Sequence, residues 1–346
     1  MLQSSDQLTI FMPGHLQSDY GKMGFGVLRY AQNKVVAVID PDHAGGSLAA
    51  ITGIDHPAPI VKDIDESIEK GANVLVIGIS PSGGRIPENW LPTIEYAIAK
   101  GLCIVNGLHD LLLPKYKNRL KAPQWIWDVR VPRTTPAVAS AKAMELNNRR
   151  ILFIGTDMAA GKMTAGLELY HWLRERNQSV GFVATGQIGI TVTGQGIPLD
   201  AFKVDLACGA VEEAVLQQRD KEILLIEGQG SLLHPGSTAT LPLMRGSCPT
   251  HMILCHRAEK THLKAPDHIR IPSLKKFIGL NEELATVIGT YPKAKVIAIT
   301  LNTSQLDEVE AKKFIKTTEE ATGIPTFDLV RFGTDALGEQ VEKIMH

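Results

Sequence analysis

The sequence predicts an α/β protein of two domains, each built on a doubly wound, mostly parallel sheet. Three observations predict this class. The chain has 346 residues, and about 150 residues per domain suggests two domains. Short β-branched runs alternate with helical patterns along almost the whole chain. These runs are continuously apolar, which is typical of strands that are buried on both faces of a parallel sheet.

The first domain is expected over residues 1–133, where strands and helices alternate. Strands are expected at Leu8–Met12, Val35–Ile39, Val74–Ile79 and Leu102–Val105, and helices at Lys22–Tyr30, Ile64–Lys70 and Leu91–Lys100. Such alternation indicates βαβ units with right-handed crossovers.

Polar residues follow the expected strands of this first domain and would share one edge of its sheet. Asp40 ends the second strand, where dinucleotide-binding folds keep a ribose-binding acid. The stretch Pro13–Gly26 lacks the G-x-G-x-x-G fingerprint, which argues against NAD. Ser82, Gly83 and His109 follow the third and fourth strands. We expect these three residues to help bind a small substrate.

A polar stretch with two prolines, Val129–Pro136, marks the domain boundary. We expect a linker over residues 134–150, within which Ala137–Asn147 is helix-prone, and a second domain over residues 151–346. Its strands are expected at Ile151–Ile154, Val180–Ala184, Glu222–Ile226, His251–Cys255 and Lys295–Thr300, and its helices at Lys162–Arg176, Ala210–Arg219 and Gln305–Thr317.

Composition and charge exclude several classes of protein. The 36 Lys and Arg residues are balanced by 37 Asp and Glu residues, so no basic excess exists for binding nucleic acid. No apolar run approaches the roughly 18 residues of a membrane span, and Met1–Met12 lacks the features of a signal peptide. We therefore expect a cytoplasmic protein without a membrane partner. Four cysteines without a C-x-x-C motif predict buried, reduced thiols: Cys103, Cys208, Cys248 and Cys255.

The strongest chemical signal lies at residues 151–164, where an apolar strand, a glycine-bearing turn and a helix start follow one another. In such a turn, backbone N–H groups converge on an anion and the helix adds its positive N-terminal end. Lys162 adds a mobile charge for a terminal phosphate. The expected cofactor-binding residues are Gly155, Thr156, Asp157, Ala159, Ala160, Gly161, Lys162, Met163 and Thr164.

This motif departs from the usual G-x-x-x-x-G-K-[ST] pattern of a P-loop in two ways. Five residues instead of four separate Gly155 from Gly161. Met163 follows Lys162 and has no hydroxyl for Mg²⁺, while Thr164 lies about 100° further round the helix. The form G-T-D-x-x-x-G-K resembles the P-loop of dethiobiotin synthetase and its relatives. For the second half of the chain, that resemblance implies ATP binding beside a small substrate.

Further candidates follow the other strands of the second half. Glu227 ends an apolar strand that would run beside the P-loop, so it is a candidate Mg²⁺ ligand or general base. His234 comes soon after it and is a second candidate base. Loops at strand ends are natural substrate clamps. The remaining candidates are Thr185, Gln187 and Arg257 for the substrate and Asn302 for a purine base.

The whole chain resembles a bacterial and archaeal family with a Rossmann-like N-domain and a P-loop C-domain, long filed as a domain of unknown function. The motifs that carry the resemblance lie at residues 78–84, 107–109, 155–164, 185–187 and 227–235. The family includes D-glutamate N-acetyltransferases, which use acetyl-CoA and work beside a dipeptide epimerase-like racemase. The resemblance implies acyl transfer to the amine of a D-amino acid. Ile188-Gly189-Ile190 stands where the family is expected to carry a Thr-Gly pair and an aromatic residue, which leaves the substrate open.

Three functions remain open at this point. In acetyl-CoA-dependent N-acetylation, Glu227 or His234 would accept the amine proton, and Lys162 or backbone N–H groups would stabilise the oxyanion. This reaction needs no Mg²⁺, in keeping with Met163. In an ATP-dependent ligase or kinase, Lys162 would hold phosphates while Glu227 and Thr164 hold Mg²⁺. The third is a non-catalytic nucleotide-binding regulator. We expect a homo-oligomer. Within the chain we expect the two sheet edges to face each other across one interdomain cleft, with the cofactor in the cradle and loops of the first half helping to bind the acceptor.

Overall fold

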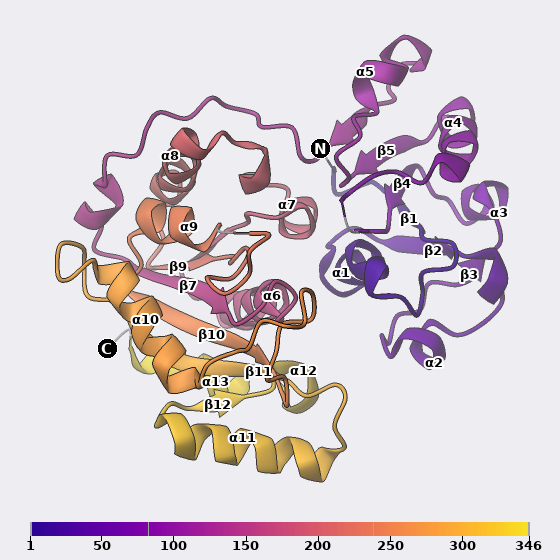
Figure 1. Ribbon diagram of the computed structural model, residues 1–346. Coiled ribbons are helices and arrows are strands. Elements are labelled where there is room, and N and C mark those ends of the chain that lie inside the picture. Colours follow the sequence, from indigo (N-terminus) through magenta and orange to yellow (C-terminus); the bar gives the residue numbers. More distant parts are fainter. Residues whose placement is uncertain (1, 82, 238, 345–346) are drawn as a thin grey trace. The chain divides into compact units, whose positions relative to one another are not determined.

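The computed structural model describes residues 2–81, 83–237 and 239–344, and the chain forms two compact units (Figure 1). Unit 1 contains Met1–Pro132 and Gln187–Pro198, and unit 2 contains Arg133–Gly186 and Leu199–His346. Each unit holds one six-stranded sheet in which every strand pair is parallel. The predicted fold class is therefore confirmed. The segment 187–198 belongs to unit 1 although the sequence of unit 2 surrounds it.

Unit 1 has the strand order of the dinucleotide-binding doubly wound fold, β3-β2-β1-β4-β5-β6. Its strands are β1 (Leu8–Phe11), β2 (Val35–Ile39), β3 (Ile60–Val61), β4 (Val74–Ile77), β5 (Cys103–Asn106) and β6 (Ile126–Asp128). Its helices are α1 (Lys22–Tyr30), α2 (Leu48–Thr52), α3 (Ile64–Glu69), α4 (Leu91–Ala99), α5 (Leu113–Tyr116) and α7 (Gln187–Thr193). Helices α1 and α7 cover one face of the sheet, and α3 and α4 cover the other (Figure 1).

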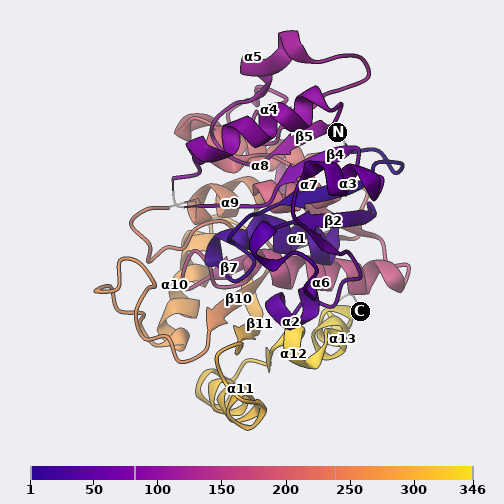
Figure 2. The same ribbon diagram turned by 90° about the vertical axis from the view of Figure 1, so that its right-hand side faces the viewer.

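Unit 2 has the strand order β12-β11-β10-β7-β9-β8. Its strands are β7 (Arg149–Gly155), β8 (Val180–Val183), β9 (Ile223–Ile226), β10 (His251–Arg257), β11 (Lys295–Asn302) and β12 (Thr326–Phe327). Its helices are α6 (Lys162–Glu175), α8 (Val204–Leu216), α9 (Thr240–Ser247), α10 (Leu274–Thr286), α11 (Glu308–Thr322), α12 (Leu329–Phe332) and α13 (Asp335–Lys343). Helix α9 packs between α8 and α10 on one face of the sheet, and α6 and α13 pack on the other (Figure 2).

The apolar strands are buried as their composition predicts. Every residue of β1, β2, β4 and β9 is buried. Helices on both faces exclude water from these strands, and the hydrophobic effect of that burial stabilises each sheet. The four cysteines are free, and Cys248 and Cys255 are buried whereas Cys103 and Cys208 are half-buried. Among the residues that the structure describes, no helix is both long and apolar enough to span a bilayer.

Two stretches differ from the local structure that the sequence predicts. The helix-prone stretch Ala137–Asn147 forms only a short 3-10 turn, Lys142–Glu145. The carboxylate of Glu212 on α8 accepts the backbone N–H groups of Ser140 (2.9 Å) and Lys142 (2.7 Å), which holds the chain extended against that helix. A long-range hydrogen bond thus overrides local helix propensity here.

The loop predicted after β8 is instead helix α7, which packs on α1 within unit 1. The packing is close, because a Cβ atom at Gly26 would lie 2.3 Å from Cγ2 of Ile188. Ile188 and Ile190 are both buried there. The chain leaves unit 2 after Gly186 and returns at Leu199, whose N–H donates to the carbonyl of Thr185 (3.2 Å).

Candidate active site

Strand β7, a turn and helix α6 form the predicted phosphate cradle at the carboxyl edge of the unit 2 sheet. Residues 155–164 run from the end of β7 through the turn into the first helical turn. Gly161 precedes the helix with φ of 101°, a conformation that favours glycine. The N–H groups at the start of a helix have no intrahelical partner, so they are available to an anion. All the predicted cofactor-binding residues except Asn302 lie in this segment.

Lys162 is buried, whereas an anion-binding lysine at the rim of a cleft would be exposed. Only 4% of the residue is exposed, and Nζ donates to the backbone carbonyls of Asp157 (2.7 Å) and Met158 (3.1 Å). Burial lowers the pKa of Lys162 to about 8. The ammonium group is therefore hydrogen-bonded to the backbone of its own turn. To contact a bound phosphate, it would have to break both of these hydrogen bonds.

The side chains of Thr156 and Asp157 hold the cradle in place. Thr156 Oγ1 forms a 2.8 Å hydrogen bond with Nδ1 of His256, the penultimate residue of β10. Burial lowers the pKa of His256 to about 4, so its ring is neutral at pH 7. Asp157 accepts the N–H of Met158 at Oδ1 (2.6 Å) and that of Lys264 at Oδ2 (2.8 Å). With both side chains engaged in these contacts, anion binding by the backbone N–H groups of the turn stays a prediction.

Glu227 follows β9, which pairs in parallel with β7 and so brings the carboxylate to the same sheet edge as Lys162. Its side chain is 2% exposed, and Oε2 accepts the N–H groups of Thr185 (2.8 Å) and Gly186 (3.2 Å). Burial raises the pKa of Glu227 to about 7, although these two N–H groups and the charge of Lys162 lower it. Glu227 thus exchanges a proton near neutral pH.

Gly228 explains how closely Glu227 approaches the cradle. A Cβ atom at Gly228 would lie 1.7 Å from the carbonyl oxygen of Phe153 on β7 and 2.8 Å from Cδ of Lys162. Only glycine allows this approach of backbone to backbone. The turn after β9 is therefore fitted against both β7 and the lysine of the cradle.

His234 is less suited to proton transfer than the sequence predicts. Its Nε2–H donates to the carbonyl of Ala265 (2.6 Å), and its Nδ1 accepts the N–H of Gly236 (3.0 Å). Both ring nitrogens are thus engaged in joining two loops. No lone pair of the ring remains to accept a proton in this arrangement.

Arg257 and Asn302 end the neighbouring strands β10 and β11, and they face each other in the strand register. Both are half-buried. The side-chain oxygen of Asn302 accepts the N–H of Ser304 (3.0 Å), so contact with a purine would involve its amide nitrogen. Thr164 is half-buried on α6, two residues after Lys162. The roles predicted for these residues, including Mg²⁺ binding by Thr164 and Glu227, stay predictions.

Comparison with known proteins places this chain in a family. Residues 137–338 match the family described as "Domain of unknown function (DUF1611_C) P-loop domain", and residues 41–132 match its "(DUF1611_N) Rossmann-like domain". The chain belongs to the DUF1611 family. The family resemblance predicted from the sequence is therefore confirmed.

Relatives of this DUF1611 protein include two that are named D-glutamate N-acetyltransferase. One, from Pseudoalteromonas sp., is 34% identical over 279 residues, which are 79% of this chain and 82% of the relative. The other, from Tritonibacter scottomollicae, is 33% identical over 302 residues, which are 86% and 89% of the two chains. The crystal structure of a DUF1611 family protein from Anabaena variabilis ATCC 29413, at 2.30 Å resolution, has a TM-score of 0.94 and is 45% identical, covering 98% of this chain and 100% of that one.

In unit 1 of this DUF1611 protein, Gln187 lies at the carboxyl edge of the sheet. Its Nε2 donates to Oγ of Ser80 (3.1 Å), which follows β4, and its Cγ would lie 3.2 Å from a Cβ atom at Gly107, which follows β5. The exposed His109 comes two residues later and donates its backbone N–H to the carbonyl of Gly84 (2.7 Å). Unit 1 therefore brings together Gln187 and the loop of His109, which are far apart in sequence.

The other candidates of unit 1 have different environments. Gly83 is exposed with φ of 80°, and Ser82 lies outside the described residues. Asp40 is fully buried, and its carboxylate accepts the N–H groups of Gly14 (3.1 Å) and Asp42 (3.3 Å) and contacts Nδ1 of His43 (2.8 Å). Asp40 thus joins the loops after β1 and β2. The single cleft expected between the two sheet edges stays a prediction.

Sequence reasoning missed His256, Ser80 and the loop of Lys264 as parts of these sites. His256 and Ser80 each follow or end a predicted strand, and that position was the signal that could have found them. The backbone N–H of Lys264 leaves no sequence signal. Its contact with Asp157 joins residues 107 positions apart in the chain.

Proposed function

We propose that this protein transfers the acetyl group of acetyl-CoA to the amine of a D-amino acid such as D-glutamate. One observation carries the proposal: Glu227, a buried carboxylate whose pKa is raised to about 7, directly follows β9, the strand that pairs with the strand of the predicted phosphate cradle. A base with a pKa near the working pH is what deprotonation of an ammonium substrate requires. The two relatives named D-glutamate N-acetyltransferase support the reaction class.

The cradle suits the diphosphate of CoA. The N–H groups of the turn and of the first turn of α6 would bind its oxygens, and Lys162 would turn from the carbonyls of Asp157 and Met158 toward them. Acetyl-CoA, when bound, supplies the thioester whose acetyl group is transferred. The sequence places Met163 where ATP-hydrolysing P-loops keep an Mg²⁺-binding hydroxyl, and acyl transfer needs no such ligand.

Glu227 would take one proton from the substrate ammonium, which leaves the amine lone pair free to attack the thioester carbonyl. The C–N bond would form as the C–S bond breaks. The nitrogen would give its second proton to the departing thiolate, and the proton held by Glu227 would pass to solvent. Because Lys162 and the N–H groups of the cradle bind the diphosphate in this proposal, we assign them to cofactor binding and Glu227 to the chemistry. For the acceptor, Thr185 and Arg257 are the candidate binding residues in unit 2.

The test is mass spectrometry of the full chain incubated separately with acetyl-CoA and with ATP·Mg²⁺, each with a panel of D- and L-amino acids. The expected product is an amino acid heavier by one acetyl group, formed with acetyl-CoA and a D-amino acid. Glu227→Gln is the matched control, because it keeps the shape of the side chain and removes the base. Phosphorylated or ligated products with ATP·Mg²⁺ would instead indicate a ligase or kinase. Binding of either nucleotide without a product would indicate a regulator.

A further inference from the structure

A short hairpin that the proposed mechanism does not use lies between β10 and α10. Its two arms meet at the antiparallel bridge between His262 and Arg270. Leu263 donates its N–H to Ile269 (2.9 Å), and Ile271 donates to Thr261 (2.8 Å). Leu263 and Ile271 are buried, whereas His262 and Arg270 are exposed. The 261–271 hairpin is therefore anchored by apolar side chains and presents polar ones to solvent.

The tip of the 261–271 hairpin is attached to the candidate active site at two points. The N–H of Lys264 donates to Oδ2 of Asp157 in the cradle (2.8 Å). The carbonyl of Ala265 accepts Nε2–H of His234 in the loop after β9 (2.6 Å). The hairpin is thus held beside the turn that would bind the diphosphate, and a ligand extending beyond that turn would meet it.

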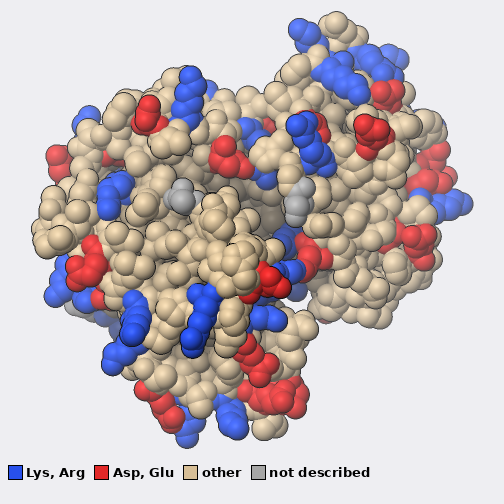
Figure 3. All heavy atoms as spheres, viewed as in Figure 1, with Lys and Arg blue, Asp and Glu red and all other residues tan. Residues whose placement is uncertain are grey.

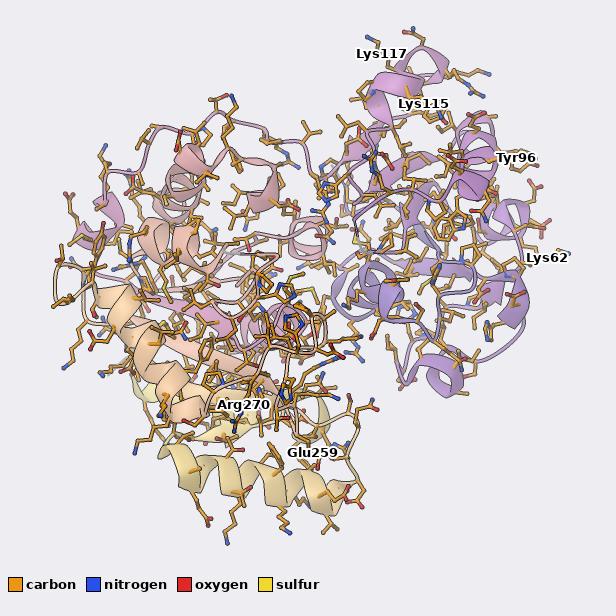
Figure 4. All side chains as sticks on the ribbon, in the orientation of Figure 1. Lys62, Tyr96, Lys115, Lys117, Glu259 and Arg270 are labelled. Carbon is orange, nitrogen blue, oxygen red and sulfur yellow. The ribbon has the colours of Figure 1, made fainter. Side chains whose placement is uncertain are left out.

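Positive charge is concentrated in this stretch. Residues 257–270 contain four Lys or Arg residues and two acidic ones, in a chain whose net charge is −1. Among the described residues, Arg257, Lys260 and Arg270 form no ion pair. Figure 4 labels Arg270 and Glu259 in this stretch. These three cations are consequently available to an anion.

A second basic stretch, around α5 in unit 1, provides a contrast. Basic side chains gather over α5 (Figure 3), and Lys115 and Lys117 are labelled there in Figure 4. Arg119 in this stretch pairs with Glu95 (3.2 Å), and Nζ of Lys115 lies 4.9 Å from the ring centre of Tyr116. Charge around α5 is thus engaged by acidic and aromatic side chains of unit 1.

We propose that the 261–271 hairpin, together with Arg257 and Lys260, recognises a phosphate group that the ligand carries outside the cradle. This inference rests on the proposed function, in which that group is the 3′-phosphate of CoA. Arg270 offers a planar guanidinium that binds a phosphate through two parallel hydrogen bonds. The chain then binds CoA more tightly than dephospho-CoA, which lacks only this phosphate.

The experiment is titration calorimetry of the full chain with CoA and with dephospho-CoA. For the unmodified chain we expect CoA to bind about tenfold more tightly, as a charged hydrogen-bonded contact provides. In Arg270→Ala that preference should fall toward unity while the affinity for dephospho-CoA stays unchanged. Lys117→Ala, which removes a surface cation directly after α5, is the matched control and should keep the full preference. Lys260→Ala combined with Arg270→Ala should bring the ratio closest to one.

The outcomes separate this inference from the function on which it rests. Equal affinities of the unmodified chain for CoA and dephospho-CoA overturn the inference and leave acetyl transfer untouched. An equal loss of affinity for both ligands in Arg270→Ala also overturns it. Binding of ATP·Mg²⁺ without binding of either CoA form overturns the proposed function and the inference with it. Because Arg270 is exposed, its replacement should not prevent folding, which a thermal melt checks.

Discussion

Asp40 in unit 1 and Glu227 in unit 2 are both buried carboxylates that follow a strand of a parallel sheet, yet their surroundings differ. Asp40 has two backbone N–H donors and the ring of His43, and it joins two loops. Glu227 has two backbone N–H donors at Oε2 but only a long hydrogen bond from Nε2 of Gln229 at Oε1 (3.4 Å), and burial raises its pKa to about 7.

The comparison teaches that a buried carboxylate at the end of a strand can have a structural or a chemical role. Which role it has depends on how completely hydrogen-bond donors and nearby positive charges compensate its negative charge. A carboxylate with close partners at both oxygens fixes the chain around it. A buried carboxylate whose ionised form is under-compensated is suited to take up a proton. Four substitutions test this division, and the largest effect is expected in unit 2.

Glu227→Gln should have the largest effect on activity. Loss of the base should lower kcat for acetyl transfer by about 10²- to 10⁴-fold, because general base catalysis contributes this much. Steady-state kinetics with acetyl-CoA and the D-amino acid acceptor check the prediction. Unchanged kcat would remove Glu227 from the chemistry and end the contrast with Asp40.

The same variant should change how stability depends on pH. Because folding raises the pKa of Glu227 from 4.5 to about 7, this residue contributes stability below pH 4.5 that is lost as the pH rises through 7. Glutamine does not titrate, so the free energy of unfolding of the variant relative to the unmodified chain should rise across this window. The rise should be on the order of 1–3 kcal/mol. Denaturant unfolding at pH 5 and pH 8 measures it, and parallel curves would contradict the raised pKa.

Lys162→Ala should weaken binding of the phosphate-bearing cofactor by about 10- to 1000-fold, since a charged hydrogen bond to phosphate is lost. Its effect on stability should be small, because two opposing terms change together. The variant leaves the carbonyls of Asp157 and Met158 without their donor, but it also removes an ammonium whose pKa burial lowers to about 8. Calorimetry with CoA and a thermal melt measure the two effects. Full CoA affinity would count against the cradle.

Asp40→Ala should show the reverse behaviour. Its loss leaves the N–H groups of Gly14 and Asp42 unpaired, and we expect the free energy of unfolding to fall by about 1–3 kcal/mol. CoA affinity and kcat should stay unchanged under conditions in which the variant is folded. A specific loss of activity without a loss of stability would show that Asp40 is part of the chemistry.

His109→Ala should have the smallest effect. His109 is exposed, so the melting temperature should not move. If its side chain helps bind the acceptor, KM for the D-amino acid should rise about 2- to 10-fold with kcat unchanged, as for one lost hydrogen bond. Unchanged KM would remove His109 from the acceptor site. The loops of unit 1 would then have a structural role only.

The sequence predicted nine of the twelve strands but only six of the thirteen α-helices that the structure describes, because the apolar pattern of these elements is uninterrupted. β2 and α1 have the predicted bounds, and β7, α6 and β9 lie within one or two residues of them. It did not predict β3, which has two residues, or α7, whose Gly and Thr residues favour a loop. The helix α7 forms because Ile188 and Ile190 pack in unit 1, and such packing is invisible in a local window.

For the site, the order strand, glycine turn and lysine located the cradle, and the end of an apolar strand located Glu227. The sequence could not predict that Lys162 is buried, because its partners are carbonyl oxygens, which every residue has. Nor could it predict the bond between Thr156 and His256, since 100 positions separate them. Contacts of this kind depend on which strands become neighbours in the sheet.

Residues 187–198 belong to unit 1 although they lie within the sequence of unit 2, and this limits how the protein can be cut into fragments or recombined. The chain passes between units at 132–133, at 186–187 and at 198–199. Cutting it at the first of these places would give an N-terminal fragment without α7, with the surface of α1 around Gly26 uncovered. The other fragment would carry α7 without its partner helix. The two halves are therefore not interchangeable modules, and a chimaera that swaps one of them must carry the twelve-residue segment along with it.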